Sequence, residues 1–367
     1  MGLLKFFSSL RLTVACLILW VILIFVATLA QVQLGIFFAK KIFFESWIVF
    51  WPVTSMIKLP VFPGGFLIGS VVLINLIAAH FTRFKWTWQK SGIWLVHTGL
   101  ILLLIGGGLT SLLGVEMQLS LSEGQQKNYA QRLDAWELAV ISSVDSGQDE
   151  VVAIPQTWLE KPGIIAHPKL PFQLKILAYF PNTSLRMGAG AATQGIGRQV
   201  QAVSAPLNTQ EVGFNTPSTY VEVFEGGKSH GVWLLSSGLG AAQEIFVGGK
   251  GYRLSLRNRR HYFSFNVKLL DFKHDVYLGT QIPKNFSSSV EVMDKIGRET
   301  HLISMNQPLR YEGFTFYQAS FADNDKTSIF QVVRNEAWWL PYVSCTLIFL
   351  GLFFHMGLMM WRGLKRG

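Results

Sequence analysis

The chain has 367 residues, of which half are hydrophobic and 15% are charged, and its net charge is +10. An excess of Lys and Arg over Asp and Glu indicates a nucleic-acid partner only where that excess lies on a soluble surface. Residues 115–336, the one long stretch without a membrane-like run, hold 21 basic and 21 acidic residues, so nucleic acid is excluded as a partner.

Four apolar runs predict transmembrane helices at about residues 12–33, 62–81, 92–113 and 338–361. Each reaches the ~20 residues needed to cross a hydrocarbon core, and none contains Lys, Arg, Asp or Glu. The first run has an alternative reading as a cleaved signal peptide, but it is long for that and we expect an uncleaved anchor.

Residues 34–61 interleave aromatic residues such as Trp47 and Trp51 with Lys40, Lys41 and Glu45. This mixture is typical of a segment that lies at the membrane–water interface. The alternative is a docking surface for another membrane protein. We expect the interfacial segment.

The charges around the runs predict the topology. Outside residues 115–336 there are eleven basic residues and one acidic residue. Eight of the eleven fall in the N-terminal tail, the connection between the second and third runs, and the C-terminal tail. They are Lys5, Arg11, Arg83, Lys85, Lys90, Arg362, Lys365 and Arg366. By the positive-inside rule these segments are cytoplasmic, which places residues 115–336 outside the cytoplasmic membrane.

The expected fold is therefore a polytopic α-helical membrane protein with four transmembrane helices and a β-rich extracytoplasmic domain between the third and fourth. Its parts are a membrane domain (1–114), the β-rich domain (115–336), and the fourth helix with a cytoplasmic tail (337–367).

Nine runs rich in β-branched and aromatic residues predict an antiparallel sandwich or irregular barrel in the β-rich domain. They are Glu137–Ser142, Gln173–Tyr179, Thr219–Phe224, Gly231–Leu235, Tyr252–Leu256, Tyr262–Asp271, Ser288–Met293, Phe314–Gln318 and Ser328–Val333. Residues 186–199 lack periodicity and predict a mobile loop. Both cysteines, Cys16 and Cys345, lie in the apolar runs, so the outer domain cannot exchange thiols.

Three histidines lie inside the apolar runs. From the helical rise, His80 is about 5 Å, His97 about 8 Å and His355 about 10 Å from the cytoplasmic edge. All three thus occupy one leaflet. Ionisable groups in transmembrane helices are candidate functional sites, and neutral imidazole is an iron ligand. The alternative is that each histidine hydrogen-bonds to a neighbouring helix. No residue of the chain stands out as catalytic.

The third run also carries a glycine stripe. Gly92, Gly99 and Gly106 recur every seven residues and line one face, which Gly107 and Gly108 widen. Small residues in such a stripe let another helix pack closely. His97 lies about 200° around the helix from Gly99 and is expected to point away from the packed face.

Several motifs resemble the ResB/CcsB family, the membrane subunit of System II cytochrome c biogenesis. They are Ser9-Leu-Arg-Leu, Phe62-Pro-Gly-Gly, Asn75-Leu-Ile-Ala-Ala with Arg83-Phe84, Gly92-Ile-Trp-Leu-Val-His97-Thr-Gly-Leu, Ile282-Pro-Lys-Asn-Phe-Ser-Ser and Asn306-Gln-Pro-Leu-Arg-Tyr-Glu-Gly-Phe-Thr-Phe-Tyr-Gln-Ala-Ser. The last is long and specific.

The resemblance implies a complex with a CcsA-like membrane protein that carries haem b across the inner membrane and attaches it to the CxxCH motifs of apocytochrome c. His97 matches the family's haem ligand in the third span, while His80 and His355 are further candidates. The family's Trp-rich motif is absent, since Trp338-Trp339 is followed by Leu340-Pro341. The chain is then expected to be a non-autonomous subunit of a holocytochrome c synthase.

Two other classes stay open. One is a b-type electron-transfer subunit, which would hold permanent haem between histidine pairs at two depths. The other is a haem-free chaperone that presents apocytochrome through the β-rich domain, for which the histidines would have no role.

Overall fold

The structure is a computed structural model that describes residues 2–52, 58–83, 87–144, 148–208, 215–279, 283–322 and 326–364. Of the residues named above, those outside these ranges are Phe84, Lys85, Ile282, Lys365 and Arg366. The chain forms two compact units. The membrane unit holds the chain up to Val115 and from Arg334 onward, and the β domain lies within Glu116–Val333.

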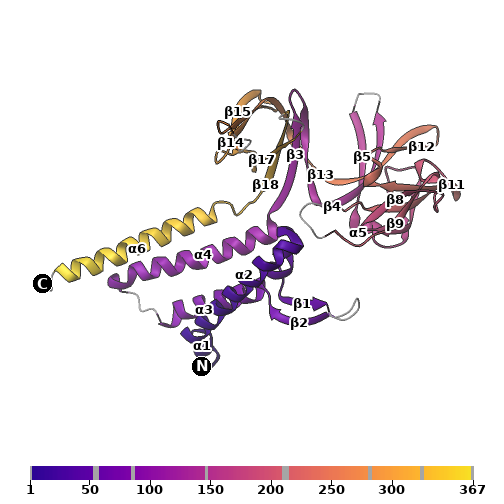
Figure 1. Ribbon diagram of the computed structural model, residues 1–367. Coiled ribbons are helices and arrows are strands. Elements are labelled where there is room, and N and C mark those ends of the chain that lie inside the picture. The colour runs from indigo at the N-terminus through magenta and orange to yellow at the C-terminus, as the bar shows by residue number, and fades with distance from the viewer. Residues whose placement is uncertain are drawn as a thin grey trace. The chain divides into compact units, whose positions relative to one another are not determined.

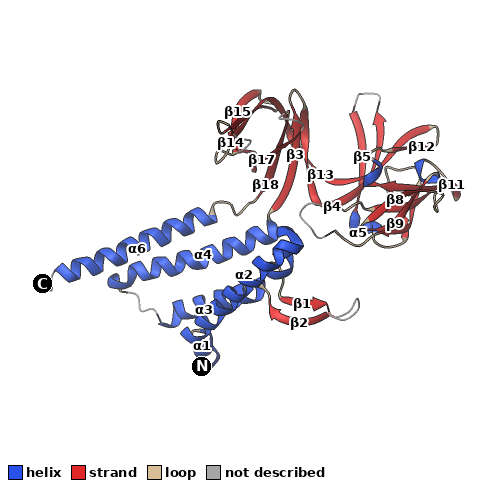
Figure 2. Ribbon diagram, in the orientation of Figure 1, coloured by secondary structure: helices blue, strands red, loops and turns tan. Residues whose placement is uncertain are grey.

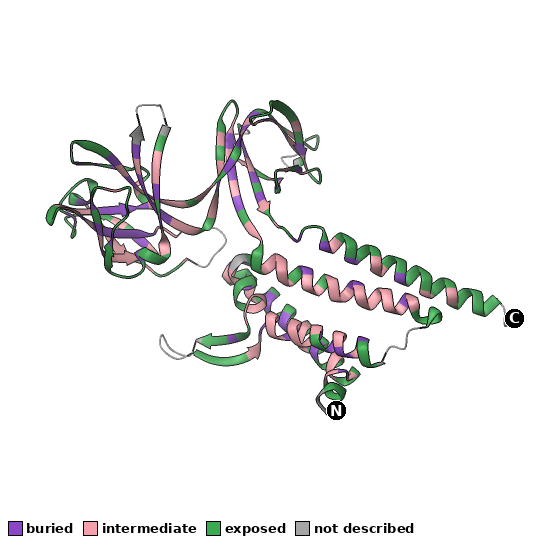
Figure 3. Cartoon of the chain, turned by 180° about the vertical axis from the view of Figure 1, so that it is seen from behind, coloured by how far each residue is buried: buried purple, intermediate pink, exposed green. Residues whose placement is uncertain are grey.

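The long helices of the membrane unit confirm the predicted architecture (Figure 1). They are α2 (Leu10–Ala39), α3 (Gly65–Arg83), α4 (Ser91–Leu113) and α6 (Leu340–Leu364), and the short α1 (Gly2–Phe7) precedes them. Among the described residues, four helical stretches are long and apolar enough to cross a membrane: Leu10–Ile36, Gly65–Thr82, Trp88–Leu113 and Leu340–Leu364. The last includes all of α6, whose side chains are mostly exposed apart from a narrow buried stripe (Figure 3).

Two predicted boundaries shift for local reasons. The second span begins at Gly65 rather than Phe62, because Phe62 and Pro63 end a strand. The fourth begins at Leu340 rather than Trp338, because a turn precedes it in which the Trp338 amide donates to the Asn335 carbonyl.

The segment 34–61 has several parts. Helix α2 bends at Gly35 (φ 71°) and continues to Ala39, followed by a π-helical turn, η1 (Lys40–Phe44). An antiparallel hairpin then forms from β1 (Ile48–Pro52) and β2 (Lys58–Pro63). Trp47 and Trp51 are exposed, as an interfacial segment requires, and the interfacial position stays a prediction.

The described part of the β domain consists mainly of antiparallel strands, with one short α-helix, α5 (Gln156–Leu159), and two 3₁₀ turns, η3 (Ile196–Arg198) and η4 (Ser237–Leu239) (Figure 2). The strands are β3 (Val115–Ser122), β4 (Gln126–Val144), β5 (Gln148–Pro155), β6 (Gly163–Ile165), β7 (Gln173–Phe180), β8 (Thr183–Met187), β9 (Val200–Ser204), β10 (Ser218–Glu225), β11 (Lys228–Ser236), β12 (Gln243–Val247), β13 (Lys250–Val276), β14 (Pro283–Met293), β15 (Arg298–Ser304), β16 (Leu309–Tyr311), β17 (Phe314–Ala322) and β18 (Thr327–Arg334).

Each of the nine predicted runs falls within a strand, but Tyr252–Leu256 and Tyr262–Asp271 belong to one long strand, β13. The largest sheet has the order β15-β14-β13-β4-β3-β18-β17-β16, with β12 paired to β13 and β5 to β4. A second sheet has the order β11-β10-β7-β6. The sequence prediction missed the other strands, among them β6 and β16, which have three residues each.

Strands β4 and β13 are shared by two hydrophobic cores. Lobe 1 is built on the end of β4 and the start of β13, with Leu138, Leu174 and Leu254 in its core. Lobe 2 is built on the start of β4 and the end of β13, and its core stacks Phe263 and Phe265, with ring centroids 5.0 Å apart. Figure 1 shows β4 and β13 running from one lobe to the other.

Residues 186–199 are irregular, as their composition predicts. The structure nevertheless attaches them to β11, because the amides of Thr193 and Gln194 donate to the Val232 carbonyl. The Ile196 amide also donates to the side chain of Gln243. The segment is therefore anchored at several points, which differs from the mobile loop that the sequence predicted.

Candidate functional site between the membrane helices

Helix α4 packs against α6 along the glycine stripe, as predicted. Gly92, Gly99 and Gly106 are its buried residues. A Cβ added to Gly99 would lie 2.7 Å from Ile348 Cγ1 and 2.8 Å from the Ser344 carbonyl oxygen. The two backbones are thus close enough to exclude even a methyl group. The expected widening of the stripe is wrong, because a Cβ at Gly107 or Gly108 would meet no described atom within 4 Å.

His355 lies on this seam. A Cβ on Gly92 would come within 2.7 Å of the His355 amide nitrogen and 2.9 Å of its Cβ. The backbone of His355 is therefore part of the α4–α6 contact. This position favours a packing role for His355 over a ligand role.

His97 lies about 200° around α4 from Gly99 and is half-buried. Its Nδ1 is 2.9 Å from the Ile93 carbonyl oxygen, one turn earlier. A carbonyl only accepts, so Nδ1 carries the proton and donates it. In the neutral tautomer with this proton, the lone pair is on Nε2. Histidines that ligate metals commonly hold their other ring nitrogen in this way, because the hydrogen bond fixes the tautomer and the orientation of the ring.

The structure brings His80 close to His97. His80 extends from α3, is 5% exposed, and interacts electrostatically with the His97 imidazole. Its ring lies edge-on against Trp94, with centroids 3.7 Å apart. Trp94 and His97 are three residues apart on α4 and so share a face. His80, Trp94 and His97 form the candidate site, whereas no described contact joins His355 to it.

Of these residues, His97 is the one that would bind haem iron, through its Nε2 atom. Among the described residues, no three His, Cys, Asp or Glu side chains gather in a way that could hold a metal ion alone. His97 would supply one imidazole nitrogen, and a second ligand would come from outside these three residues. His80 packs against the indole of Trp94, and its role as a haem ligand stays a prediction.

Sequence reasoning did not assign Trp94 to the site. The signal was present, since Trp94 is one helical turn before His97. This spacing alone does not assign Trp94 to the site, because the sequence does not show that α3 places His80 on the same side of α4.

Several family motifs have structural roles. Asn75 is 1% exposed and ties the break between α1 and α2, because its amide donates to the carbonyls of Phe7 and Ser9 while Thr13 donates to it. A Cβ on Gly64 would overlap the Ser46 carbonyl, so the turn after β2 requires glycine.

The motif beginning at Asn306 is also structural. Its Tyr311 hydroxyl donates to Asp294, which closes the β14–β15 turn. Gln318, in the same motif, bonds to Ser288 and Ser328 in a buried polar cluster. The most specific motif in the chain therefore supports the β domain, and supplies no residue to the candidate site.

Four apolar helices and a β-rich domain define a polytopic helical membrane protein. Comparison with known proteins narrows this class. Residues 241–335 match the ResB-like family, which confirms the predicted resemblance to ResB/CcsB and supports a role in cytochrome c biogenesis. Protein NrfI of Wolinella succinogenes is 30% identical over 97 residues, which span 26% of this chain and 10% of NrfI. The family match lies in the carboxyl-terminal part of the β domain and does not include His97.

Proposed function

We propose that the chain is a subunit of a System II cytochrome c maturation complex. In this proposal it acts with a CcsA-like partner in the inner membrane to move haem outward, for attachment to the CxxCH motifs of apocytochrome c. The ResB-like match supports the process. The further step, haem binding by His97 of this chain, is our proposal.

The main support for haem binding by this chain is the hydrogen bond made by the His97 side chain. The His97 Nδ1–H donates a hydrogen bond to the Ile93 carbonyl oxygen, and in that tautomer Nε2 is the nitrogen that can bind iron. The glycine seam holds the opposite side of α4 against α6, so haem binding on the His97 face does not compete with the α4–α6 contact. Haem is the cargo in this scheme, and the partner supplies the second axial ligand.

The proposed topology places both termini in the cytoplasm and the β domain in the periplasm. Its support is the neutral β domain beside basic flanks. Reporter fusions are expected to place residue 200 outside and residues 87 and 367 inside. A cytoplasmic signal at residue 200 would overturn this orientation.

The decisive experiment purifies the chain with its CcsA-like partner and measures haem by absorbance, alongside the yield of mature c-type cytochrome. His97→Ala is expected to leave the complex assembled while lowering both quantities several-fold. Added imidazole is expected to restore part of the yield by occupying the vacated coordination position.

His355→Ala is the matched control, because it removes an intramembrane histidine whose contact is with the glycine seam. Its haem content is expected to stay near the wild-type level once assembly is accounted for. Full haem and full maturation in His97→Ala would reject the haem-ligand role and favour the chaperone alternative. Haem that persists and cycles reversibly between oxidation states without apocytochrome would favour the electron-transfer alternative.

A further inference from the structure

Strand β13 reverses its buried face partway along its length. In lobe 1 the buried residues are Tyr252, Leu254 and Leu256, at even positions. In lobe 2 they are Phe263, Phe265, Val267 and Leu269, at odd positions. Successive strand residues face opposite sides, so the side that is interior in one lobe becomes exterior in the other. The crossing is the polar sequence 257–262, Arg-Asn-Arg-Arg-His-Tyr.

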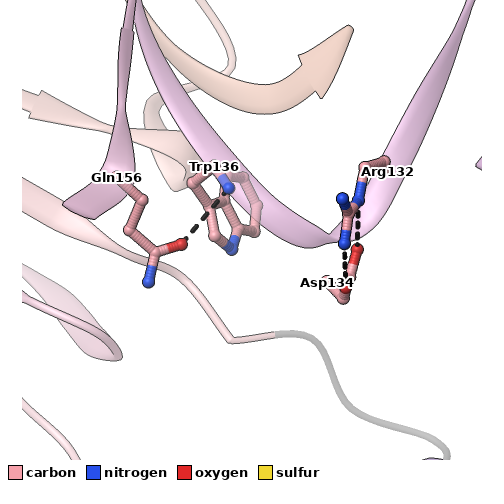
Figure 4. A network of polar contacts seen from close by, with 4 residues as sticks. All are labelled: Arg132, Asp134, Trp136 and Gln156. Carbon is pink, nitrogen blue, oxygen red and sulfur yellow. Dashed lines mark hydrogen bonds and ion pairs between the residues drawn. The ribbon is translucent and has the colours of Figure 1, made fainter. Parts of the chain in front are cut away.

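The partner strand accommodates the reversal with a bulge. Asn258 of β13 faces Trp136, but the next residue, Arg259, faces Arg132, which leaves residues 133–135 of β4 without Cα partners on β13. Figure 4 shows this stretch, where Arg132 pairs with Asp134 and the Trp136 amide donates to Gln156. The bulge thus lies where the buried face of β13 changes sides.

Two of the cations at the crossing are neutralised. Arg132 makes a two-bond pair with Asp134, at 3.0 and 2.6 Å. Arg257 pairs with Glu137 at 2.9 Å, and both side chains are almost fully buried. Each of these acids is therefore already matched by an arginine.

Two further cations gather around one tyrosine. The Arg260 guanidinium carbon lies 4.0 Å from the Tyr129 ring centroid, and Lys127 Nζ lies 6.0 Å from it. Tyr262, the register partner of Tyr129, adds a second ring at 5.7 Å. Lys127 Nζ donates to the Ser120 carbonyl at 2.7 Å, which satisfies one of its donors but carries no negative charge. Among the described residues, no ion pair joins an acidic side chain to Lys127 or Arg260.

The two cations also repel one another. Burial lowers the pKa of Lys127, and the neighbouring Arg260 lowers it further. A half-buried pair of like charges is unfavourable unless an anion compensates it. The domain as a whole is formally neutral, so this local excess is a property of the crossing.

We propose that Lys127 and Arg260, with the rings of Tyr129 and Tyr262, form a carboxylate-binding site on the β domain. Arginine and lysine donate charge-assisted hydrogen bonds to carboxylates, and the tyrosine rings offer flat apolar surface beside them. The carboxylate could come from either haem propionate or an acidic side chain of a polypeptide. The haem source rests on the proposed function, and the polypeptide source does not.

The test uses the full-length chain in detergent and metal-free mesoporphyrin IX as the probe. This porphyrin has two propionates but no iron, so His97 cannot ligate it. Its binding is followed by fluorescence, beside that of its dimethyl ester and of a labelled glutamate-rich peptide. The Lys127→Gln/Arg260→Gln variant is expected to bind the free acid about tenfold to a hundredfold more weakly than wild type.

Lys250→Gln is the matched control. Lys250 Nζ also lies over a tyrosine ring, 5.7 Å from the centroid of Tyr252, but it has Glu150 nearby. The affinity of Lys250→Gln for the porphyrin is expected to match wild type. Because the probe lacks iron, its binding does not depend on ligation by His97, which separates this site from the haem-ligand proposal. Arg260→Lys is expected to fall between wild type and the double variant, because it keeps the charge but loses the planar fork.

Comparing the porphyrin with the peptide shows which kind of carboxylate the site binds. Weaker binding of the free acid alone in the double variant assigns the site to a propionate, and weaker binding of the peptide alone assigns it to a polypeptide carboxylate. Unchanged affinity for both probes in a double variant whose thermal unfolding matches wild type would overturn the proposal. So would equal binding of free acid and diester, if the peptide also fails to bind.

Discussion

The membrane unit and the β domain bury their polar groups in different ways. In the membrane unit the helix seam is made of glycines, and the buried amide of Asn75 bonds to backbone carbonyls and a threonine. In the β domain an ion pair, Arg257–Glu137, is nearly fully buried. The helix seam and the hydrophobic cores of the β domain are stabilised differently because one is surrounded by lipid and the other by water. Helices surrounded by lipid gain nothing from apolar contact alone and depend on close approach, whereas a domain in water is stabilised by apolar burial.

The largest expected effect is at the glycine seam. Gly99→Leu places side-chain atoms where Ile348 and the Ser344 carbonyl already lie, and α4 and α6 cannot separate without losing their contact. We expect loss of the folded protein, measured as monodisperse yield in detergent. Gly107→Leu is the control and is expected to behave as wild type, since no described atom lies within 4 Å of a Cβ there.

The second effect is at the buried ion pair of the β domain. Glu137→Leu leaves Arg257 buried without its acid, which is expected to cost about 3–5 kcal/mol of unfolding free energy. Urea unfolding monitored by circular dichroism measures it. The exposed pair Arg253–Asp149 is the control, and Asp149→Leu is expected to change stability by about 0–1 kcal/mol. Equal losses in the two variants would remove the distinction between the buried and exposed pairs.

A smaller loss of stability is expected when the hydrogen bonds of Asn75 in the membrane unit are removed. Asn75→Leu leaves the Phe7 and Ser9 carbonyls without its amide and is expected to destabilise the unit by about 1–2 kcal/mol. Thermal unfolding in detergent is the measurement. Thr28→Val, which removes a hydroxyl bonded only to its own helix at the Ile24 carbonyl, is expected to have little effect.

The smallest effect is a pH dependence at the β14–β15 turn. The hydrogen bond from Tyr311, together with the amides of Gly297 and Ile296, lowers the pKa of Asp294. Its stabilisation is therefore present above the ordinary aspartate pKa of about 3.9 and is lost as pH falls through the lower folded value. The same bond raises the pKa of Tyr311 to about 12, so a second loss is expected as pH rises from about 10 towards that value.

Thermal melting across pH, with Tyr311→Phe beside wild type, measures both losses. The variant is expected to show a weaker acid dependence and no contribution from residue 311 at high pH. Identical profiles for the two proteins would show that this turn does not depend on the Tyr311–Asp294 bond.

Local pattern was sufficient wherever the physical requirement was local. An uncharged run of about twenty residues can cross a bilayer whatever surrounds it, so the four spans were predicted to within a few residues. The seven-residue glycine repeat predicted a packed face because helical geometry places those positions together. Phe62-Pro63 and Trp338-Trp339 were assigned to spans because composition alone does not show where a strand or turn interrupts an apolar run.

The sequence by itself thus determined the class of protein, its spans, the glycine face of α4 and the candidacy of its three intramembrane histidines. Only the tertiary structure decided that His80 and Trp94 stand beside His97 while His355 lies on the seam, and that β13 serves two cores on opposite faces. These arrangements depend on which helix or strand packs against which. Such contacts join residues far apart in the chain, and no local periodicity encodes them.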